Sequence, residues 1–287
     1  MASITVPASL STGGPLRPLN ILHDLPQVAD LIELCFSASM DDEGQSYLQQ
    51  MRRAGHDNNF LRWAGNMMDS ASLPLTGFVW EEQGKIVGNA SLVFQPYKGR
   101  KIALIANVAT HPDFRKRGIA RALTERTIQY ARQRGIKELW LHVRDDNPTA
   151  VRIYADLGFV ERARRTTYHS ASTALSTATG NGVTVTQPNP RDWPLQRTWL
   201  ARTHPDELSW YSHWDWDVLG PGVWNWLSRT FLEFDVRQWS ARKDGELLAT
   251  LTWMPTPRAA NMLWVAVGPN SDAAGLRSVL EAARRHL

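Results

Sequence analysis

The sequence contains a single cysteine, Cys35, among its 287 residues. One cysteine excludes an internal disulfide and any metal cluster built from several thiolates, a usage typical of proteins in a reducing compartment. Cys35 lies on the apolar face of an expected helix, where packing is a commoner role than reactivity. Long apolar runs and a signal-peptide start are also missing, so we expect no membrane span, no metal and a cytoplasmic location.

The sequence also has only a small excess of one charge. Its formal net charge of +4 suits an anionic small molecule but falls short of the large basic surfaces of nucleic-acid-binding proteins. The nucleotide-binding fingerprints GxxxxGK(S/T) and GxGxxG are absent. The apolar content of 43% and the charged content of 21% are ordinary for a globular protein, and the length is comfortable for two domains.

The most informative stretch runs from Ala103 to Ala120, ALIANVATHPDFRKRGIA. A strand-like run is followed by a turn, a basic loop that ends at Gly118, and a helical pattern that begins at Ile119. The free N–H groups and the positive end of a helix together bind anions, phosphates above all. Gly118 lets the backbone approach a ligand closely. Taken alone, such a loop is as often a solvated helix cap.

A second motif extends from Val143 to Phe159, and the two motifs together resemble the GNAT superfamily of acyl-CoA-dependent N-acyltransferases. The family's loop signature, Gln/Arg-x-x-Gly-x-Gly/Ala, is matched by Arg115, Gly118 and Ala120. A later family run, Asn-x-x-Ala-x-x-x-Tyr-x-x-x-Gly-Phe, is matched by Asn147, Ala150, Tyr154, Gly158 and Phe159. Both motifs occur in order, with room between them for one helix and one strand. The resemblance covers residues 16–170.

The resemblance implies an α/β (α+β) fold of the GNAT type, in which helices flank a mixed, mostly antiparallel sheet. The local patterns predict strands at 16–20, 77–82, 85–95, 103–110, 137–143, 159–163 and 165–170. They predict helices capped at Asp24, over 43–65, over 119–134, and over 148–157 with Asn147 as the cap. By resemblance, the region around Tyr47 shapes the acceptor pocket.

The second half of the chain resembles a faded copy of the first. Residues 244–252 repeat the pattern of 83–91, and residues 265–269 repeat that of 108–112. Gly275 then corresponds to Gly118, but Asp272 replaces Arg115, and a carboxylate repels a diphosphate. We therefore predict a flexible tail at 1–15, a catalytic GNAT domain at 16–170, a linker at 171–182, and a degenerate, incomplete GNAT-like domain without cofactor at 183–287.

Ten of the 13 tryptophans lie between Trp193 and Trp264, so the two halves differ in core or surface chemistry. In one interpretation these rings pack a core and a seam between the domains. In the other, residues 210–217 receive a cationic or aromatic acceptor on ring faces and carboxylates.

Acetyl-CoA is the donor that the resemblance implies. Its pantetheine arm would pair with Val108, Ala109 and Thr110 in the manner of an added strand. The diphosphate would contact the basic loop and the first helical turn, formed by Arg115, Lys116, Arg117, Gly118, Ile119 and Ala120. By resemblance, a backbone N–H near Val108 polarises the thioester carbonyl, and Asn147 is a helix cap that often contacts the cofactor too.

Tyr154 is, by resemblance, the general acid beside the departing sulfur; its alternative is a packed helix tyrosine. No general base is evident, because Ala106-Asn107 stands where many family members have a glutamate. His142 is the candidate we carry forward, and His111, Glu81 or an ordered water are alternatives. An acceptor that arrives deprotonated would need no dedicated base.

These features predict an N-acetyltransferase that acts on a primary amine of a small molecule or peptide, by direct attack in a ternary complex, as a monomer or homodimer. The alternative is a non-catalytic CoA-binding sensor, because the base is unidentified. An aromatic interaction module for nucleic acid or protein is less well supported, since few basic residues accompany the tryptophans. We expect neither nucleic acid nor a membrane as a partner.

Overall fold

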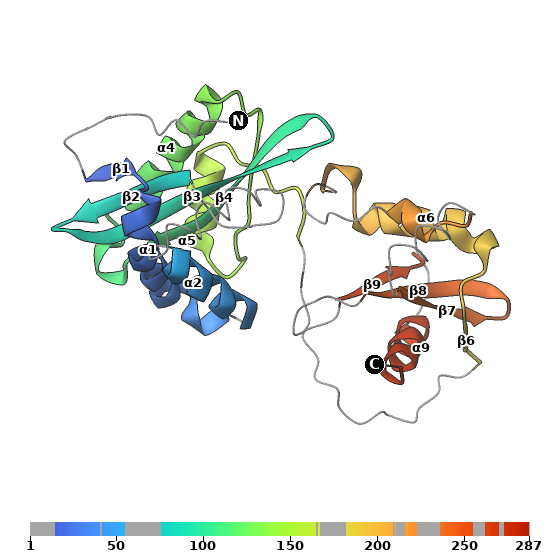
Figure 1. Ribbon diagram of the computed structural model, residues 1–287. Helices are drawn as coiled ribbons and strands as arrows, with labels where there is room; N and C mark the ends of the chain where they lie inside the picture. The colour runs from blue at the N-terminus through green and yellow to red at the C-terminus, as the bar shows by residue number, and fades with distance from the viewer. Residues whose placement is uncertain are drawn as a thin grey trace. The chain divides into compact units, whose positions relative to one another are not determined.

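The computed structural model describes residues 15–40, 42–54, 76–164, 166, 182–208, 210, 216–222, 236–254, 262–269 and 273–286. The chain divides into two compact units, residues 1–164 and 165–287 (Figure 1). The predicted tail and linker lie almost entirely outside the described residues, as does the predicted helical region beyond Ala54. The proposed domain boundaries therefore stay predictions.

The first unit is built on a five-stranded sheet of order β1-β2-β3-β4-β5. Its strands are β1 (Leu16–Pro18), β2 (Thr76–Glu82), β3 (Lys85–Tyr97), β4 (Arg100–Thr110) and β5 (Glu138–Leu141). All neighbours pair antiparallel except β4 and β5, which are parallel. This confirms the predicted mixed, mostly antiparallel sheet and the hairpin around Gln83-Gly84.

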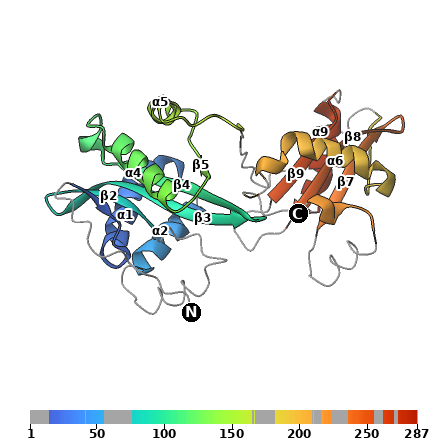
Figure 2. The same ribbon diagram turned by 90° about the horizontal axis from the view of Figure 1, so that it is seen from above.

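Helices cover both faces of this sheet. They are α1 (Ile21–Phe36), α2 (Asp42–Ala54), α4 (Ile119–Gln133) and α5 (Pro148–Asp156), with short 3-10 turns η1 (Ser37–Ser39) and η2 (Pro112–Phe114). Val79 and Ile86 pack with α1 and α2, whereas their neighbours Phe78 and Val87 pack with α4. Because successive strand residues point to opposite faces, α1 and α2 lie on one face and α4 on the other (Figure 2).

The first helix begins earlier than the sequence predicts. Asn20, not Asp24, is its cap, since the Asn20 side chain accepts a hydrogen bond from Leu22 N at 3.2 Å. Asp24 is buried in the first turn and binds the Arg17 guanidinium at 2.6 Å. The carboxylates of Asp24 and Glu81 raise the pKa of Arg17, so this guanidinium stays charged. Asp24 thus anchors β1 to α1 and is not the cap.

The predicted strand at 159–163 does not form. Residues 159–164 are irregular and largely exposed. The strands predicted at 16–20 and 137–143 are shortened to β1 and β5. Residues 167–170 of the last predicted strand lie outside the described residues.

The second unit holds a four-stranded antiparallel sheet of order β6-β7-β8-β9. Its elements are β6 (Thr184–Thr186), η3 (Pro190–Asp192), α6 (Trp193–Thr203), η4 (Asp206–Leu208), η5 (Trp216–Leu219), β7 (Arg237–Lys243), β8 (Glu246–Met254), β9 (Met262–Val267) and α9 (Ala273–Arg284). Trp239 and Trp253 pack with α9, while Trp199, which belongs to α6, lies in one cluster with Trp216 and Leu247. These four rings therefore belong to the core of the second unit. Residues 211–215, part of the segment that the alternative interpretation assigns to an acceptor, lie outside the described part of the chain.

The hairpin of the second unit repeats that of the first. Its β7–β8 register shifts between Ala241 and Arg242, ahead of a turn in which Asp244 and Gly245 have positive φ. The β2–β3 register shifts at the corresponding place, ahead of a turn with two positive-φ residues. Such turns match the twist of a hairpin.

The helix that follows the repeated hairpin differs from α4. Gly118 precedes α4 with a φ of 79°, whereas Gly275 lies inside α9. A Cβ at Gly275 would lie 2.6 Å from Leu248 Cβ, so this glycine serves close packing of the helix on β8. The predicted equivalence of the two glycines is therefore wrong in conformation.

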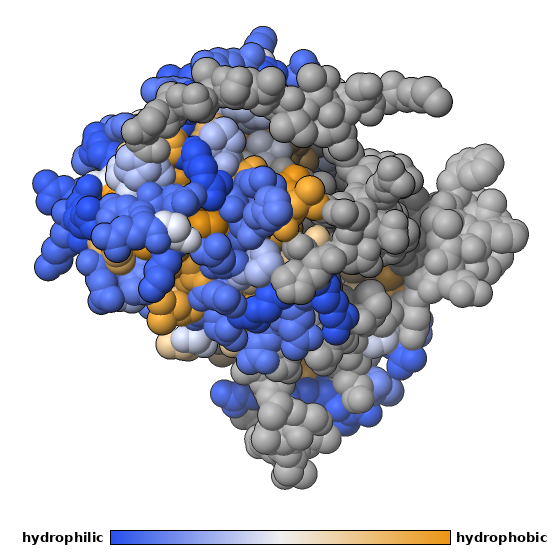
Figure 3. All heavy atoms as spheres, turned by 60° about the vertical axis from the view of Figure 1, so that its left-hand side comes forward, coloured by the Kyte–Doolittle hydropathy of each residue, from blue (hydrophilic) through white to orange (hydrophobic). Residues whose placement is uncertain are grey.

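The surface of the first unit is mainly polar. Figure 3 turns this unit forward, and hydrophilic side chains cover most of its coloured surface. Larger exposed apolar side chains, such as Leu34 and Val160, are scattered. None of the helices in the described ranges is long and apolar enough to traverse a bilayer.

Gly88 of β3 provides the first test of this packing. A Cβ at Gly88 would lie 2.7 Å from Ile119 Cγ2 and 2.9 Å from Leu123 Cδ1. We expect Gly88→Ala to lower the free energy of unfolding by about 1–3 kcal/mol through overpacking. Denaturant titration measures this. The double variant Gly88→Ala/Ile119→Ala should lose clearly less than the sum of the two single variants, and strict additivity would contradict the close approach of α4.

Candidate functional site

The edge of β4 opens where β5 ends. The parallel pairing runs from Ile102↔Glu138 to Ile105↔Leu141, and β5 stops there. Within the described residues, β5 therefore offers no partner to residues 108–110. An unpaired stretch of strand can bind an extended ligand through main-chain hydrogen bonds.

A bulge in β4 lies directly before this open edge. Asn89 pairs with Ala109 but Ser91 pairs with Ala106, so β4 carries one extra residue between them. Asn107, within this bulge, has a left-handed φ of 53°. Bulges increase the local bend of a strand and redirect its backbone. The bulge thus turns the N–H and C=O groups of β4 just before Val108.

Buried side chains hold the bulge in place. Asn89 is fully buried, and its Nδ2 donates to Asn107 O at 2.8 Å and to Ser91 Oγ at 3.1 Å. Asn107 Nδ2 donates to Tyr47 Oη of α2 at 2.7 Å. The network thereby connects β3, the bulge and α2. Our sequence reasoning assigned no role to Asn89 or to the Asn107 side chain. The signal available in the sequence was an asparagine within a run of strand-forming residues, because asparagine tolerates a left-handed backbone.

Tyr47 is a poor base despite its position at the bulge. Burial raises the pKa of Tyr47 to about 12, although the hydrogen bond from Asn107 acts in the opposite direction. The phenol is therefore neutral at physiological pH. It can donate or accept a hydrogen bond, but it does not take up a proton there.

The basic loop after β4 aims backbone donors at one point. Lys116 has a φ of 62° and Gly118 a φ of 79°, and α4 begins at Ile119. Left-handed residues in a short loop curl the chain so that successive N–H groups face the same side. The first four N–H groups of a helix have no intrahelical acceptor. The loop and the first turn of α4 therefore form the predicted anion-binding geometry.

The charged side chains of the loop have different partners. Arg115 Nε donates to Thr110 O at 3.4 Å, beside the open edge of β4. Arg117 pairs with Glu82 at 2.8 Å and lies over the ring of Phe114. Lys116 is exposed. Arg115 and Lys116 therefore supply the charge nearest to the candidate anion site.

Two observations on β4 fit the donor that the sequence implies. Thr110 Oγ1 is buried and has no hydrogen-bond partner among the described residues. The strand edge at 108–110 leads directly into the loop that carries the open N–H groups. A molecule with an amide-bearing arm and an anionic end fits this arrangement, in which neutral backbone groups of β4 are followed by the positive end of α4.

Cys35 lies near this strand end but has a packing role. Its Sγ donates to Thr110 O at 3.4 Å, and the side chain packs against the cluster of α1 and α2. Burial raises the pKa of the Cys35 thiol, although Arg115 acts in the opposite direction. A raised pKa disfavours the reactive thiolate.

Tyr154 lies on α5, where its ring contacts Phe159 edge-on. Asn147 caps α5 as predicted, with its Oδ1 accepting from Ala150 N at 3.1 Å. Tyr154 is 8% exposed, and burial raises its pKa above the ordinary value. Asp156 lies 3.4 Å from the Arg121 guanidinium, which links the end of α5 to the first turns of α4. Val108 and Phe159 pack on one shared core cluster.

The candidate bases His142, Glu81 and His111 lie in three different surroundings. His142 is exposed and follows the end of β5. Glu81 binds the Arg17 guanidinium at 2.6 Å. His111 Nδ1 accepts from Asp113 N at 3.3 Å, and its ring packs edge-on against Phe114.

Comparison with known proteins agrees with this geometry. Residues 27–159 match the model of the Acetyltransferase (GNAT) family. The [Ribosomal protein bS18]-alanine N-acetyltransferase of Escherichia coli K12 is 40% identical over 67 residues, which cover 23% of this chain and 45% of that one. The mycothiol acetyltransferase of Amycolatopsis mediterranei is 32% identical over 87 residues, 29% of each chain.

Among solved structures, this chain is similar to a putative acetyltransferase from Agrobacterium tumefaciens, with 23% identity and a TM-score of 0.39. The match covers 54% of this chain and 99% of that one. The chain spans less than half the length of the curated relatives named above. Residues 27–159 form a domain of the GNAT family.

Asn107 provides a test of the bulge. We expect Asn107→Ala to be less stable than Asn107→Gly by about 1 kcal/mol, because only glycine adopts the left-handed backbone without cost. Both variants lose the hydrogen bond to Tyr47, and Tyr47→Phe removes the same bond from the other side. Thermal and denaturant unfolding of the three variants measure the two effects separately. Equal stability of the alanine and glycine variants would mean that the left-handed conformation is not required.

Proposed function

We propose that the first unit is an N-acetyltransferase that transfers an acetyl group from acetyl-CoA to a primary amine of a small molecule or peptide, by direct attack in a ternary complex. The observation that carries this proposal is the continuity of the open β4 edge with the left-handed loop and the start of α4. The family of residues 27–159 supports it, as does the similarity to an enzyme that acetylates an alanine amine of a ribosomal protein.

The donor supplies an acyl group activated as a thioester. In this proposal the backbone of Val108, Ala109 and Thr110 binds the amide-bearing arm as an added strand. The N–H groups of Arg117, Gly118, Ile119 and Ala120 bind the diphosphate, and the side chains of Arg115 and Lys116 add positive charge. Asn147, beyond its role as a cap, is a further candidate contact.

Two groups of the chain would stabilise the transition state. The backbone N–H at Val108, redirected by the bulge, would donate to the carbonyl oxygen as negative charge develops there, a contribution of about 3–4 kcal/mol. Tyr154 would give its phenolic proton to the departing thiolate. Because burial raises the pKa of Tyr154, the phenol keeps this proton at neutral pH. As the N–C bond forms and the C–S bond breaks, the surplus ammonium proton leaves to water or to a base.

The acceptor amine must attack as the neutral base. His142 remains our named candidate for removing its proton, although it is exposed. An acceptor that arrives deprotonated needs no such residue. Tyr47 lies at the bulge and can orient an amine through its hydroxyl oxygen, without itself changing protonation.

The second unit, in our proposal, is a degenerate GNAT-like copy that binds no donor. Its hairpin supports this, with a register shift and a turn like those of the first unit. The position of Gly275 argues against a donor site, because this glycine is buried inside α9.

Neutralising the loop should weaken donor binding. We expect Arg115→Ala and Lys116→Ala each to raise the Kd for CoA by about 10–100-fold, because a charge-assisted hydrogen bond contributes about 1.5–3 kcal/mol. Isothermal titration calorimetry measures this. Lys101→Ala, an exposed lysine near the opposite end of β4, is the matched control and should bind as the parent does. Unchanged affinity in both loop variants would sink the assignment of the loop.

Removing the phenol should slow turnover without loss of donor binding. We expect Tyr154→Phe to lower kcat by about 10²–10⁴-fold, measured by thiol release with a panel of amines. Tyr97→Phe, at the far end of β3, is the control. Because the pKa of Tyr154 is raised above its usual value of about 10, parent kcat should show no loss from this group below about pH 10. Tight CoA binding by the parent, with no turnover on any amine, would instead favour the non-catalytic sensor.

A further inference from the structure

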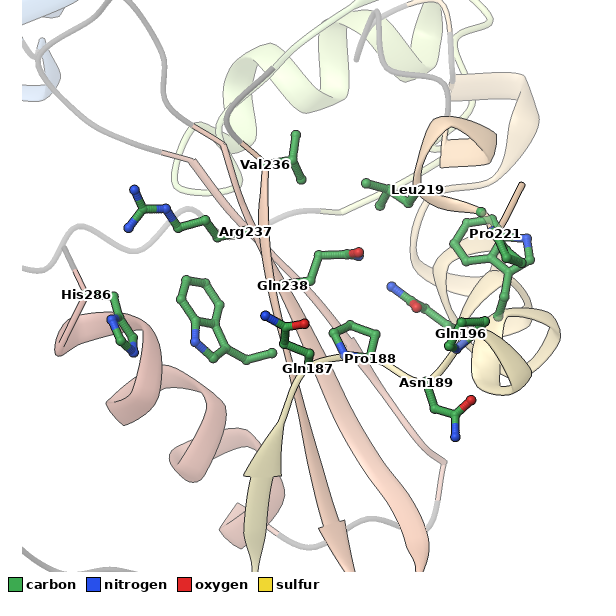
Figure 4. Close-up of a pocket in the computed structure, with 14 residues that line it drawn as sticks. Gln187, Pro188, Asn189, Gln196, Leu219, Pro221, Val236, Arg237, Gln238 and His286 are labelled. Carbon is green, nitrogen blue, oxygen red and sulfur yellow. The ribbon is translucent and has the colours of Figure 1, made fainter. Parts of the chain in front are cut away.

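The second unit contains a pocket of about 490 Å³. It lies among the chain that follows β6, the start of α6, the residues around η5, the start of β7 and the end of α9 (Figure 4). This volume falls within the range of about 300–1,000 Å³ that small-molecule sites occupy. All of its lining residues belong to the second unit.

Side-chain amides dominate the polar part of this pocket. They belong to Gln187, Asn189, Gln196 and Gln238. Figure 4 shows the amide ends of Gln196 and Gln238 turned toward the space between α6 and β7. The side chains therefore converge from separate elements of the fold.

Gln196 carries the strongest evidence for a ligand. Its residue is 3% exposed, and its Nε2 has no hydrogen-bond partner among the described residues. A buried donor left without an acceptor is destabilising, so folded proteins rarely retain one without a reason. Among the buried side-chain N and O atoms without a partner in the described ranges, Gln196 Nε2 is the one that lines the pocket.

The neighbouring amides offer both kinds of hydrogen-bonding group. Gln238 Nε2 donates to Thr252 Oγ1 at 3.1 Å, which directs its oxygen to other donors. Asn189 Oδ1 accepts from Arg191 N at 3.0 Å, which leaves its NH₂ group to donate elsewhere. A ligand in this pocket therefore meets both hydrogen-bond donors and a hydrogen-bond acceptor.

The Arg237 guanidinium is the one permanently charged group among the lining residues of this pocket. No carboxylate is among its lining residues. The Arg237 guanidinium lies over the Trp253 ring, 5.2 Å from its centroid. Trp193 and Trp239 supply apolar surface, and Trp239 stacks on His286. The neutral amides suit a molecule whose polar groups both donate and accept hydrogen bonds. The indole rings suit the C–H surface of the same molecule.

The geometry points to a binding site for an uncharged, polyhydroxylated ligand, a sugar, in this amide-lined pocket. Each hydroxyl can donate to the oxygen of Gln238 and accept from the NH₂ groups of Gln196 and Asn189. The sugar ring's C–H surface lies against tryptophan. The pocket contacts the C-terminal end of α9 through His286, so it is not the counterpart of the anion site at the start of α4.

Saturation-transfer NMR and calorimetry on the full chain test this site. The probes are methyl α-D-glucoside, N-acetyl-D-glucosamine and trehalose, with glucuronate and glucose 6-phosphate as charged comparators. We expect at least one neutral sugar to bind and the charged analogues to bind more weakly. Gln196→Leu should weaken binding by about tenfold, the effect of one hydrogen bond, without lowering Tm, because it replaces an unpartnered amide by an apolar group of similar size.

Two further variants guard the interpretation. Gln187→Ala alters an exposed rim residue, so folding is not at issue, and it should also weaken binding. Gln129→Leu makes the same substitution as in the Gln196 variant at an exposed position of α4 and should change nothing. Absence of binding by every neutral sugar, parental affinity in both pocket variants, or a marked fall in Tm for Gln196→Leu would each overturn the proposal.

Discussion

The first unit depends on the hydrogen bonds by which one buried side chain, Asn89, holds the β4 bulge. Its amide donates to the carbonyl of Asn107, whose backbone is left-handed. The amide nitrogen of Asn89 makes two donor bonds, whereas its Oδ1 is buried without a partner among the described residues. The bulge determines how β4 presents Val108–Thr110, and those residues determine where the strand meets the loop. The bulge thus lies just before the open edge of β4, which leads into the loop that precedes α4.

The two units show how one hairpin can support different surfaces. Both have a register shift before a tight turn, and both place a helix after the third strand of the meander. In the first unit Gly118 stays outside the helix and opens a loop. In the second, Gly275 is buried against Leu248, so the helix packs closely on the sheet. A glycine at the same spacing therefore precedes the helix in one unit and is packed inside it in the other.

Much of the fold was predictable because its signals are local. The Gln83-Gly84 turn, the Asn147 cap and the helix after Gly118 each depend on residues close in sequence. The exceptions have long-range causes. Asp24 looked like a cap but binds Arg17 of β1, and residues 159–163 were predicted as a strand but are irregular and largely exposed. Asn89 and Tyr47 were missed because they approach the bulge from other elements.

The sequence by itself determined the family resemblance, the order of the elements and the residues of the loop before α4, because a loop between a strand and a helix is specified by its own residues. Only the tertiary structure decided that β4 is bulged and open beyond Ile105, that Arg117 is engaged by Glu82, and that Gln196 faces a pocket. Those features depend on contacts between residues far apart in the chain, and no local pattern encodes the distance between them.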